Sequence, residues 1–353
     1  MRILVLAAIA LGVLVPVQAS AAPTTLPRIR AVIVSATTGA RLAETTGSAP
    51  RPFSTAIGDG RGGFFVAGAG KLVRLRADGT LDPAFVAAVA PIKALTLTRG
   101  VLVTAGSSGL AFLNPLSGAR VHPTLPLAPA GTRVSVTAIA ASGPLVFVVG
   151  ANTRGENGAS QLAFGANVTT GTRTGFHPIV RKGIATGVAA AGSVVYLAGG
   201  FSRVGGAARY GIASVTAATG ALRSWRSATC LPESPFAMKA TAHTLFIGRL
   251  HGFLALRTDT GSLLTWSRRS SIALSASGVA SLALSGHTLY LGTVGDASAV
   301  TIGSTSRRGF VALDATSGAV RAFRLHVRRF QNGKAIAVSG ARLLAYGSFS
   351  SSP

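Results

Sequence analysis

The sequence predicts an all-β protein: a seven-bladed β-propeller of four-stranded antiparallel blades, closed by a split blade from the N- and C-terminal segments. Three observations lead to this prediction: a recurring hairpin pattern, a glycine turn that follows each hairpin, and a half unit at each end. Of 353 residues, 48% are hydrophobic and 12% are charged, so the chain has to bury a large core.

The hairpin pattern is a pair of short β-rich runs on either side of a small polar turn. It is clearest at 136–150, 187–199, 280–292 and 335–347, and weaker copies lie at 54–68, 93–106 and 239–248. Valine, leucine and aromatic residues crowd the second run, while glycine or serine stands at the centre. This arrangement favours strand, turn and strand over a membrane-spanning helix.

Each complete unit continues with an apolar run, a small or acidic residue, a glycine and a further short strand. The glycines are Gly79, Gly118, Gly171, Gly220, Gly261 and Gly318, 39 to 57 residues apart. This spacing is close to the ~40–50 residues of propeller repeats. Aromatic residues stand five positions after four of these glycines, at Phe176, Trp225, Trp266 and Phe323. We expect these side chains to pack between neighbouring blades.

The two ends of the chain carry complementary halves of one unit. The segment 30–42 has the glycine turn with no hairpin before it, and 335–347 has the hairpin with no turn after it. A radial array of blades leaves exposed edges unless its last blade pairs with its first. We therefore predict units at about 53–86, 91–122, 133–176, 184–225, 236–266 and 278–323, and a seventh at 335–353 completed by 28–43.

The first 21 residues have the pattern of a secretory signal peptide. Arg2 precedes an apolar stretch over 3–15 that is too short to span a bilayer, and Ala19-Ser20-Ala21 is a small-x-small cleavage site. We expect 22–353 to form a single propeller domain, secreted, extracellular or associated with the cell envelope, with no membrane span. An uncleaved N-terminal anchor is the alternative.

Two stretches resemble a known repeat. Residues 63–85 read GFFVAGAGKLVRLRADGTLDPAF, and residues 198–225 read AGGFSRVGGAARYGIASVTAATGALRSW. Both resemble delta-60 repeats, which are propeller units of secreted bacterial proteins. Residues 312–323 are similar, more distantly, to the units of quinoprotein-type (PQQ-like) propellers. The resemblance extends from 28 to 349 but is sharp only in the first two stretches. It implies a propeller fold and secretion, and it carries no general enzymatic activity.

Residue types that carry catalytic or metal chemistry are sparse. The sequence has nine Asp and Glu, one cysteine (Cys230) and six histidines that are scattered at no ligand spacing. We therefore expect no catalytic residue, no metal site and no cofactor, and a protein that is not an enzyme. The alternative is a propeller enzyme, a quinoprotein-like oxidoreductase or a polysaccharide lyase or hydrolase, with carboxylates clustered at the mouth of the central channel.

The charge is strongly positive and unevenly placed. Lys and Arg number 34 against nine acidic residues, a formal net charge of +25. In antiparallel blades the hairpin turns, such as those at Gly118 and Gly220, share one face of the disc, the tight-turn face. The loops that vary in length, such as 151–161 and 200–211, share the other, the variable-loop face. Candidate polyanion-binding residues on this second face are Arg154, Arg181, Arg203, Arg209, Arg268, Arg307, Arg308 and Arg328.

Arginine holds phosphate and carboxylate groups in bidentate fashion, and a field of one sign concentrates anions. We therefore expect a secreted, non-catalytic binding or scaffold propeller that contacts anionic envelope or extracellular polymers, or another extracellular protein. Nucleic acid is less favoured because aromatic residues are few in these loops, with Phe201 the main stacking candidate. Compositional bias combined with solubility is the alternative account of the arginine excess, and a repeat protein with no specific ligand is the third alternative.

Overall fold

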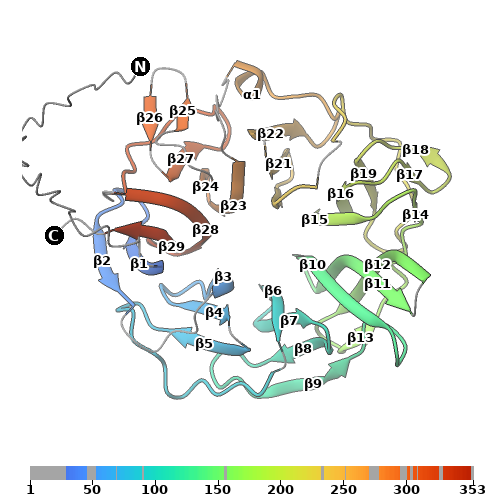
Figure 1. Cartoon of the computed structure of the whole chain (residues 1–353), viewed down its shortest axis with the longest axis horizontal. Coiled ribbons are helices and arrows are strands. Elements are labelled where there is room, and N and C mark those ends of the chain that lie inside the picture. The colour runs from blue at the N-terminus through green and yellow to red at the C-terminus, as the bar shows by residue number, and fades with distance from the viewer. Residues whose placement is uncertain are drawn as a thin grey trace, which may run out of the picture.

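The computed structural model describes residues 29–45, 53–68, 70–89, 91–154, 157–231, 234–250, 252–269, 278–294, 300–302, 305–307, 309–325 and 329–350. Their strands form seven blades arranged around a central axis, and Figure 1 looks down that axis. The prediction of an all-β, seven-bladed propeller is confirmed. The signal-peptide prediction falls on residues outside the described ranges.

The first three blades follow one another along the chain. Blade one contains β3 (Phe53–Gly58), β4 (Phe64–Gly68) and β5 (Lys71–Leu75). Blade two contains β6 (Ile92–Thr98), β7 (Val101–Gly106), β8 (Gly109–Leu113) and β9 (Arg120–Leu125). Blade three contains β10 (Arg133–Ser142), β11 (Leu145–Arg154), β12 (Asn157–Asn167) and β13 (Thr172–Arg173). In each blade the first strand lies nearest the axis (Figure 1).

The next three blades repeat the arrangement. Blade four contains β15 (Ala185–Ala191), β16 (Val194–Gly199) and β19 (Ile212–Thr216); blade five contains β20 (Ala237–Ala240), β21 (Thr244–Arg249) and β22 (Gly252–Arg257); blade six contains β23 (Gly278–Ser285), β24 (Thr288–Val294) and β27 (Phe310–Asp314). The fourth strand of blades one, four, five and six is reduced to a single bridge, Leu75 to Leu81, Val215 to Leu222, Leu256 to Leu263 and Leu313 to Val320. A five-residue helix, α1 (Thr265–Arg269), follows the outer bridge of blade five and departs from the expectation of strands alone.

Two small sheets stand apart from the blades. One contains β14 (Val180–Arg181), β17 (Arg203–Val204) and β18 (Ala207–Ala208), and the other contains β25 (Val300–Ile302) and β26 (Thr305–Arg307). The strands β17 and β18 lie within the long loop of blade four, and β25 and β26 lie within that of blade six. The variable loops are therefore partly structured.

The closing blade joins the two ends of the described chain. Its strands β28 (Arg329–Ser339) and β29 (Arg342–Ser350) continue into β1 (Ile29–Ser35) and β2 (Arg41–Glu44) in the order β28-β29-β1-β2. β1 runs antiparallel to β29, with Ile29 opposite Ser348 and Ser35 opposite Arg342. In Figure 1 the blue and red ribbons meet in this blade. The predicted split blade is confirmed.

The core is divided into clusters that lie between blades. Phe176 packs on Phe147 with ring centroids 4.8 Å apart, in a cluster that also contains Val195 and Leu197 of blade four. Trp225 packs on Tyr196 at 5.4 Å, and its Nε1 donates to the Arg257 carbonyl of blade five at 3.3 Å. The aromatic residues that follow the repeat glycines therefore lie between neighbouring blades, as expected.

The repeat glycines meet the preceding blade at the same place. Gly220 has a φ of +78°, and a Cβ there would come within 2.4 Å of the Pro178 nitrogen, just after Phe176. Gly318 has a φ of +73°, and its Cβ would come within 2.3 Å of the Trp266 ring. Glycine is required here both for the left-handed backbone and for the close contact. The glycine and aromatic spacings are thus two parts of one contact between blades.

Candidate functional site

The described carboxylates lie on outer strands and at tight turns. Ion pairs among the described residues are Arg74–Asp59 (2.9 Å), Arg74–Asp82 (3.1 Å), Arg76–Asp82 (3.2 Å), Arg257–Asp259 (2.8 Å), Arg321–Asp314 (2.6 Å) and Arg41–Glu44. Each of these arginines already has an acidic partner. Glu156, Glu233 and Asp296 lie outside the described residues.

Asp59 shows how charge is used on the tight-turn face. Its carboxylate accepts hydrogen bonds from the backbone N–H groups of Arg61 (2.7 Å) and Gly63 (2.9 Å), from Arg74 (2.9 Å) and from the Ser339 hydroxyl (3.0 Å). Burial is the largest single influence and acts to raise the pKa of Asp59, but these hydrogen bonds together lower it. Because Ser339 ends β28, the cluster stabilises the contact between blade one and the closing blade.

A different arrangement occurs in the small sheet on the variable-loop face. The register of β14 and β17 places Arg181 directly opposite Arg203, and both side chains are exposed. Lys182 follows Arg181, is also exposed and has a φ of +55°. Like charges directly opposite each other destabilise a strand pair. In Figure 1 this sheet lies at the outer rim beside blade four.

Apolar contacts hold this small sheet together in spite of its charges. Val204 is fully buried, and Val180 packs against the same cluster between blades three and four. The Gly205 N–H donates to the Ile179 carbonyl at 2.9 Å, and the Arg203 guanidinium donates to the Gly206 carbonyl. The two arginines are therefore fixed side by side by contacts that do not involve an acid.

The other predicted arginines are placed differently. Arg209 is only 6% exposed, and its guanidinium donates to the carbonyls of Ala208 (2.8 Å) and Arg223 (3.2 Å). Burial, and secondarily Arg226, lower the pKa of Arg209. This guanidinium joins the loop of blade four to its outer strand and offers little surface to a polymer. Arg307 is half-buried in β26, where burial and then Arg324 lower its pKa.

The remaining four arginines have no described side chain. Arg154 ends β11 and Arg268 lies in α1, where only the backbone is described, while Arg308 and Arg328 fall outside the described residues. Of the eight predicted residues, the described structure therefore brings together Arg181 and Arg203.

The aromatic residues of these loops also differ from expectation. Phe201, the predicted stacking candidate, is 3% exposed and packs in the cluster between blades three and four, so it cannot stack on a ligand. Tyr210, in the same loop, is 62% exposed and was missed by the sequence analysis. A tyrosine after the buried Arg209 carries no sequence signal that separates it from a core residue.

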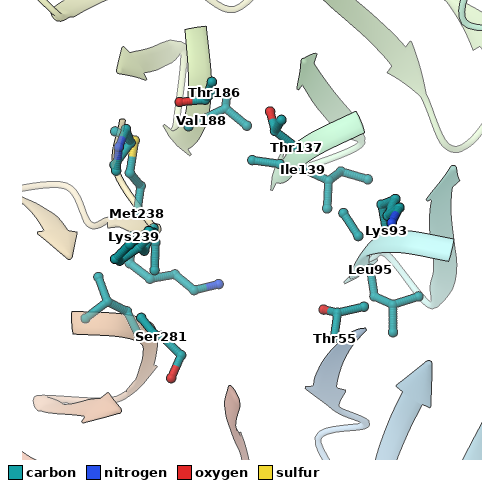
Figure 2. A pocket seen from close by; sticks show the side chains of 18 of the residues that line it. Thr55, Lys93, Leu95, Thr137, Ile139, Thr186, Val188, Met238, Lys239 and Ser281 are labelled. Carbon is teal, nitrogen blue, oxygen red and sulfur yellow. The ribbon is translucent and has the colours of Figure 1, made fainter. Parts of the chain in front are cut away.

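The central channel holds a cavity of about 520 Å³ lined by the first strands of the blades. Figure 2 shows Lys93, Thr137, Thr186, Lys239 and Ser281 around it, together with aliphatic side chains. Breaks in register make Lys93, Thr137 and Thr186 the extra residues of β-bulges in β6, β10 and β15. Bulges often redirect a side chain next to a functional site.

Lys239 occupies a register position at which each of the other six blades has an apolar residue. It lies opposite Phe246, two residues before Gly248. The residues at the same register in the other blades are Ala56, Leu95, Ile139, Val188, Ala283 and Ile336. In Figure 2 the Lys239 amine extends into the open channel. Although water reaches this side chain, protein surrounds it, and the desolvation lowers the pKa of Lys239.

These lysines were not among the predicted site residues, although the sequence carries a signal for them. Lysine occurs only five times, at Lys71, Lys93, Lys182, Lys239 and Lys334. Two of these, Lys93 and Lys239, begin a predicted hairpin, and Lys334 immediately precedes a third. Among the described residues, no group of three or more His, Cys, Asp or Glu gathers in a way that would hold a metal ion. No described helix has the length and apolar character needed to cross a membrane.

Comparisons with known proteins agree with the fold. No protein-family model matches the sequence, and no curated protein matches it. The computationally designed Ika8 protein is similar in structure, with a TM-score of 0.55 and 12% identity over 87% of this chain and 96% of that one. The WD40 domain of Neurospora crassa Pan2 has a TM-score of 0.54 at 8% identity over 84% and 89% of the two chains.

A third similar structure is the extracellular domain of BT4673 from B. thetaiotaomicron. It has a TM-score of 0.52 at 12% identity over 90% of this chain, which spans 40% of that one. Likenesses at these identities concern the fold alone. Together with the seven blades and the shared closing blade, they show that the chain is a β-propeller.

Proposed function

We propose that this protein is a secreted, non-catalytic binding propeller that holds an anionic polymer on its variable-loop face. The observation that carries the proposal is the pair Arg181 and Arg203, which are exposed and directly opposite each other in a small sheet. A phosphate or carboxylate group between them would replace repulsion with two charge-assisted contacts. Lys182 extends the same positive surface.

A polymer fits this surface better than a single small anion does. The surface lies at the rim of the disc, and the chain as a whole has a net charge of +25. A field of that sign raises the local concentration and the association rate of a polyanion over a wide area. Phosphate-bearing wall polymers and acidic polysaccharides have the repeated charges that such a surface would contact.

The affinity for inorganic polyphosphate and polygalacturonate, measured with the full chain between ~50 and ~300 mM salt, tests the proposal. Log affinity falls as log salt concentration rises, and removing one arginine that contacts a phosphate makes this slope less steep by about 1. The double variant Arg181→Ser, Arg203→Ser should therefore make it less steep by about 2. The matched double variant Arg120→Ser, Arg173→Ser removes the same charge from the outer strands β9 and β13 and should keep the original slope.

Equal slopes for the two double variants would count against this proposal. So would the absence of affinity at ~50 mM salt, where polyanion binding is strong. Either result would leave compositional bias as the better explanation of the arginines. Tighter binding of single-stranded DNA than of both polymers would reassign the surface to nucleic acid.

The enzymatic alternative requires acidic groups at the channel. The polar side chains that line the described part of the channel include two lysines, Lys93 and Lys239, and the hydroxyls of Thr137, Thr186 and Ser281. This set is suited to holding anions, and it supports a binding role over acid–base catalysis by paired carboxylates.

We also propose that the repeats are of the delta-60 type, with a more distant PQQ-like relationship, and that the protein is exported. The support lies in the sequence, in 63–85, 198–225 and the signal-peptide pattern of 1–21. Expression in a bacterial host should release a protein whose N-terminal sequence begins at Ala22. Recovery from the cell interior with Met1 still present would contradict export.

A further inference from the structure

We infer that the central channel is a separate binding site for a small oxyanion, a molecule bearing phosphate or carboxylate groups, held by Lys93 of blade two and Lys239 of blade five. This site goes beyond the proposed polymer surface, because Arg181 and Arg203 lie at the rim while the channel lies on the axis (Figures 1 and 2). Its volume of about 520 Å³ falls within the ~300–1,000 Å³ typical of small-molecule sites.

Lys239 places a positive charge in the channel wall at a register where the other blades place none. At its register the other six blades place alanine, leucine, isoleucine or valine, so an aliphatic residue satisfies the packing at this layer. The Lys239 side chain is exposed to the water of the channel, and its positive charge would be stabilised by a nearby counter-charge. Among the described residues of the channel wall none is acidic. A bound anion would provide that counter-charge.

Thr186 and Ser281 are two further polar residues that line the same cavity. Thr186 Oγ1 and Ser281 Oγ are buried and have no hydrogen-bond partner in the described structure, whereas the Thr137 hydroxyl donates to the Val149 carbonyl at 3.0 Å. Buried polar groups without partners are uncommon and call for an explanation. A rotation of either side chain about χ1 would turn its hydroxyl toward the channel, where it could donate to an oxyanion. Blades two, four, five and six would then each contribute one group.

Two of the β-bulges place lysines on strands next to the axis. Lys93 is the extra residue of the bulge in β6, and Lys334 is the extra residue at the same register in β28. Three of the five lysines of the chain therefore lie on strands that surround the axis. Lysine is a compact point charge that suits a small anion, while arginine predominates on the outer surfaces.

Site-specific lysine acylation tests the inference, because five lysines can be followed separately by mass spectrometry. The full chain is labelled with trace acetic anhydride in the presence of pyrophosphate, citrate or sodium chloride at matched ionic strength. Pyrophosphate or citrate should slow the acylation of Lys93 and Lys239 at least fivefold and leave Lys71, which is exposed on β5, within twofold. The more protective of the two anions identifies the favoured group, phosphate or carboxylate.

The same experiment separates this site from the polymer surface. Lys182 lies beside Arg181, so a long polyphosphate should protect Lys182, and small anions should not. Protection of Lys93 and Lys239 without protection of Lys182 would support the channel site even if the polymer proposal failed. Uniform slowing of all five lysines would show a non-specific effect of the anion and would overturn the channel site.

The variant Lys239→Met provides the decisive control. It places an apolar side chain where the other blades have one, so the melting temperature should be at least that of the natural chain. In this variant the concentration of pyrophosphate or citrate that half-protects Lys93 from acylation should rise at least fivefold. In the control variant Lys71→Met it should stay the same. Lys239→Gln serves as a second variant if Lys239→Met fails to fold. Unchanged protection of Lys93 in a folded Lys239 variant would overturn the inference.

Discussion

The two faces of the disc use the same residue type in opposite ways. On the tight-turn face, Arg74 contacts both Asp59 and Asp82, and Asp59 in turn joins blade one to Ser339 of the closing blade. On the variable-loop face, Arg181 lies opposite Arg203. The count of arginines therefore says little about function, and the partner of each arginine says much more.

Two glycine turns, one on each face, differ in what surrounds them. Gly220 on the tight-turn face and Gly206 in the hairpin of β17 and β18 have nearly the same φ, +78° and +83°. A Cβ on Gly220 would collide with the chain of blade three, whereas a Cβ on Gly206 would meet nothing within 4 Å. The turn at Gly220 is therefore fixed by a contact between blades, whereas the turn at Gly206 is open to solvent.

The largest expected effect concerns the closing blade. Deleting residues 22–46 removes β1 and β2 and exposes the edge of β29, so the melting temperature of the whole domain should fall by more than about 10 °C, or soluble protein should be lost. Calorimetry measures this. Arg41→Ser, which leaves the strands in place, is the control. Loss of a local spectroscopic signal with otherwise unchanged unfolding would contradict the role of the split blade.

The glycine pair gives the next largest expected effect. Gly220→Ala should destabilise the fold by more than about 3 kcal/mol, because backbone strain adds to the collision with Pro178. Gly206→Ala carries the backbone strain alone and should destabilise by about 1 kcal/mol. Urea denaturation of both variants measures the difference. Equal losses would mean that contact between blades adds nothing at the tight-turn face.

The next prediction concerns the ion pair between Asp59 and Arg74 on the tight-turn face. Asp59→Asn should destabilise by about 2–3 kcal/mol at pH 7, because a buried ion pair loses one partner while Arg74 keeps Asp82. The pKa of Asp59 is lower in the folded protein than in the unfolded chain. Its stabilisation is therefore present above ~pH 4 and is lost as the pH falls through the folded pKa.

Urea denaturation at several pH values between 7 and 2.5 measures this change. Over that range the free energy of unfolding should fall less for the Asp59→Asn variant than for the natural chain. Asp78→Asn is the matched control, because Asp78 is exposed and its side chain bonds only to Thr80. It should leave stability at pH 7 unchanged. A similar loss in both variants would mean that the Asp59 cluster does not join the blades.

The smallest expected effect concerns the cross-strand pair Arg181 and Arg203. Arg203→Glu changes a repulsive cross-strand pair into an attractive one, so stability should rise by less than about 1 kcal/mol while polyphosphate affinity falls. Arg120→Glu, on the outer strand of blade two, should leave the affinity nearly unchanged. A fall in stability for Arg203→Glu would mean that the pair is already balanced by an acid.

Much of the fold was predictable because repeated contacts leave repeated residues. Gly220 and Phe176, or Gly318 and Trp266, belong to one contact that recurs between blades, so their spacing is visible in the sequence. The half units at the two ends predicted the closing blade for the same reason. The helix α1 and the bridges that replace outer strands were not predictable, since edge residues such as Leu222 have few contacts that fix their backbone.

The site was less predictable because it depends on register between distant segments. Arg181 and Arg203 were both candidates, but their opposition follows from the burial of Val180 and Val204 against another blade. The buried guanidinium of Arg209 and the buried ring of Phe201 depend on the same loop packing. The channel lysines were missed because a lysine in a short strand resembles a solvated edge residue until the strands are arranged around an axis.

The order in which the closing blade is assembled has a consequence for folding. β1 (Ile29–Ser35) pairs with β29 (Arg342–Ser350), about 300 residues later, so the ring cannot close until the segment that contains β29 is available. Contacts of such large sequence separation form slowly, and the open edges of a partial ring can pair with other chains in the meantime. The open edges are therefore protected from aggregation only after β29 has paired with β1.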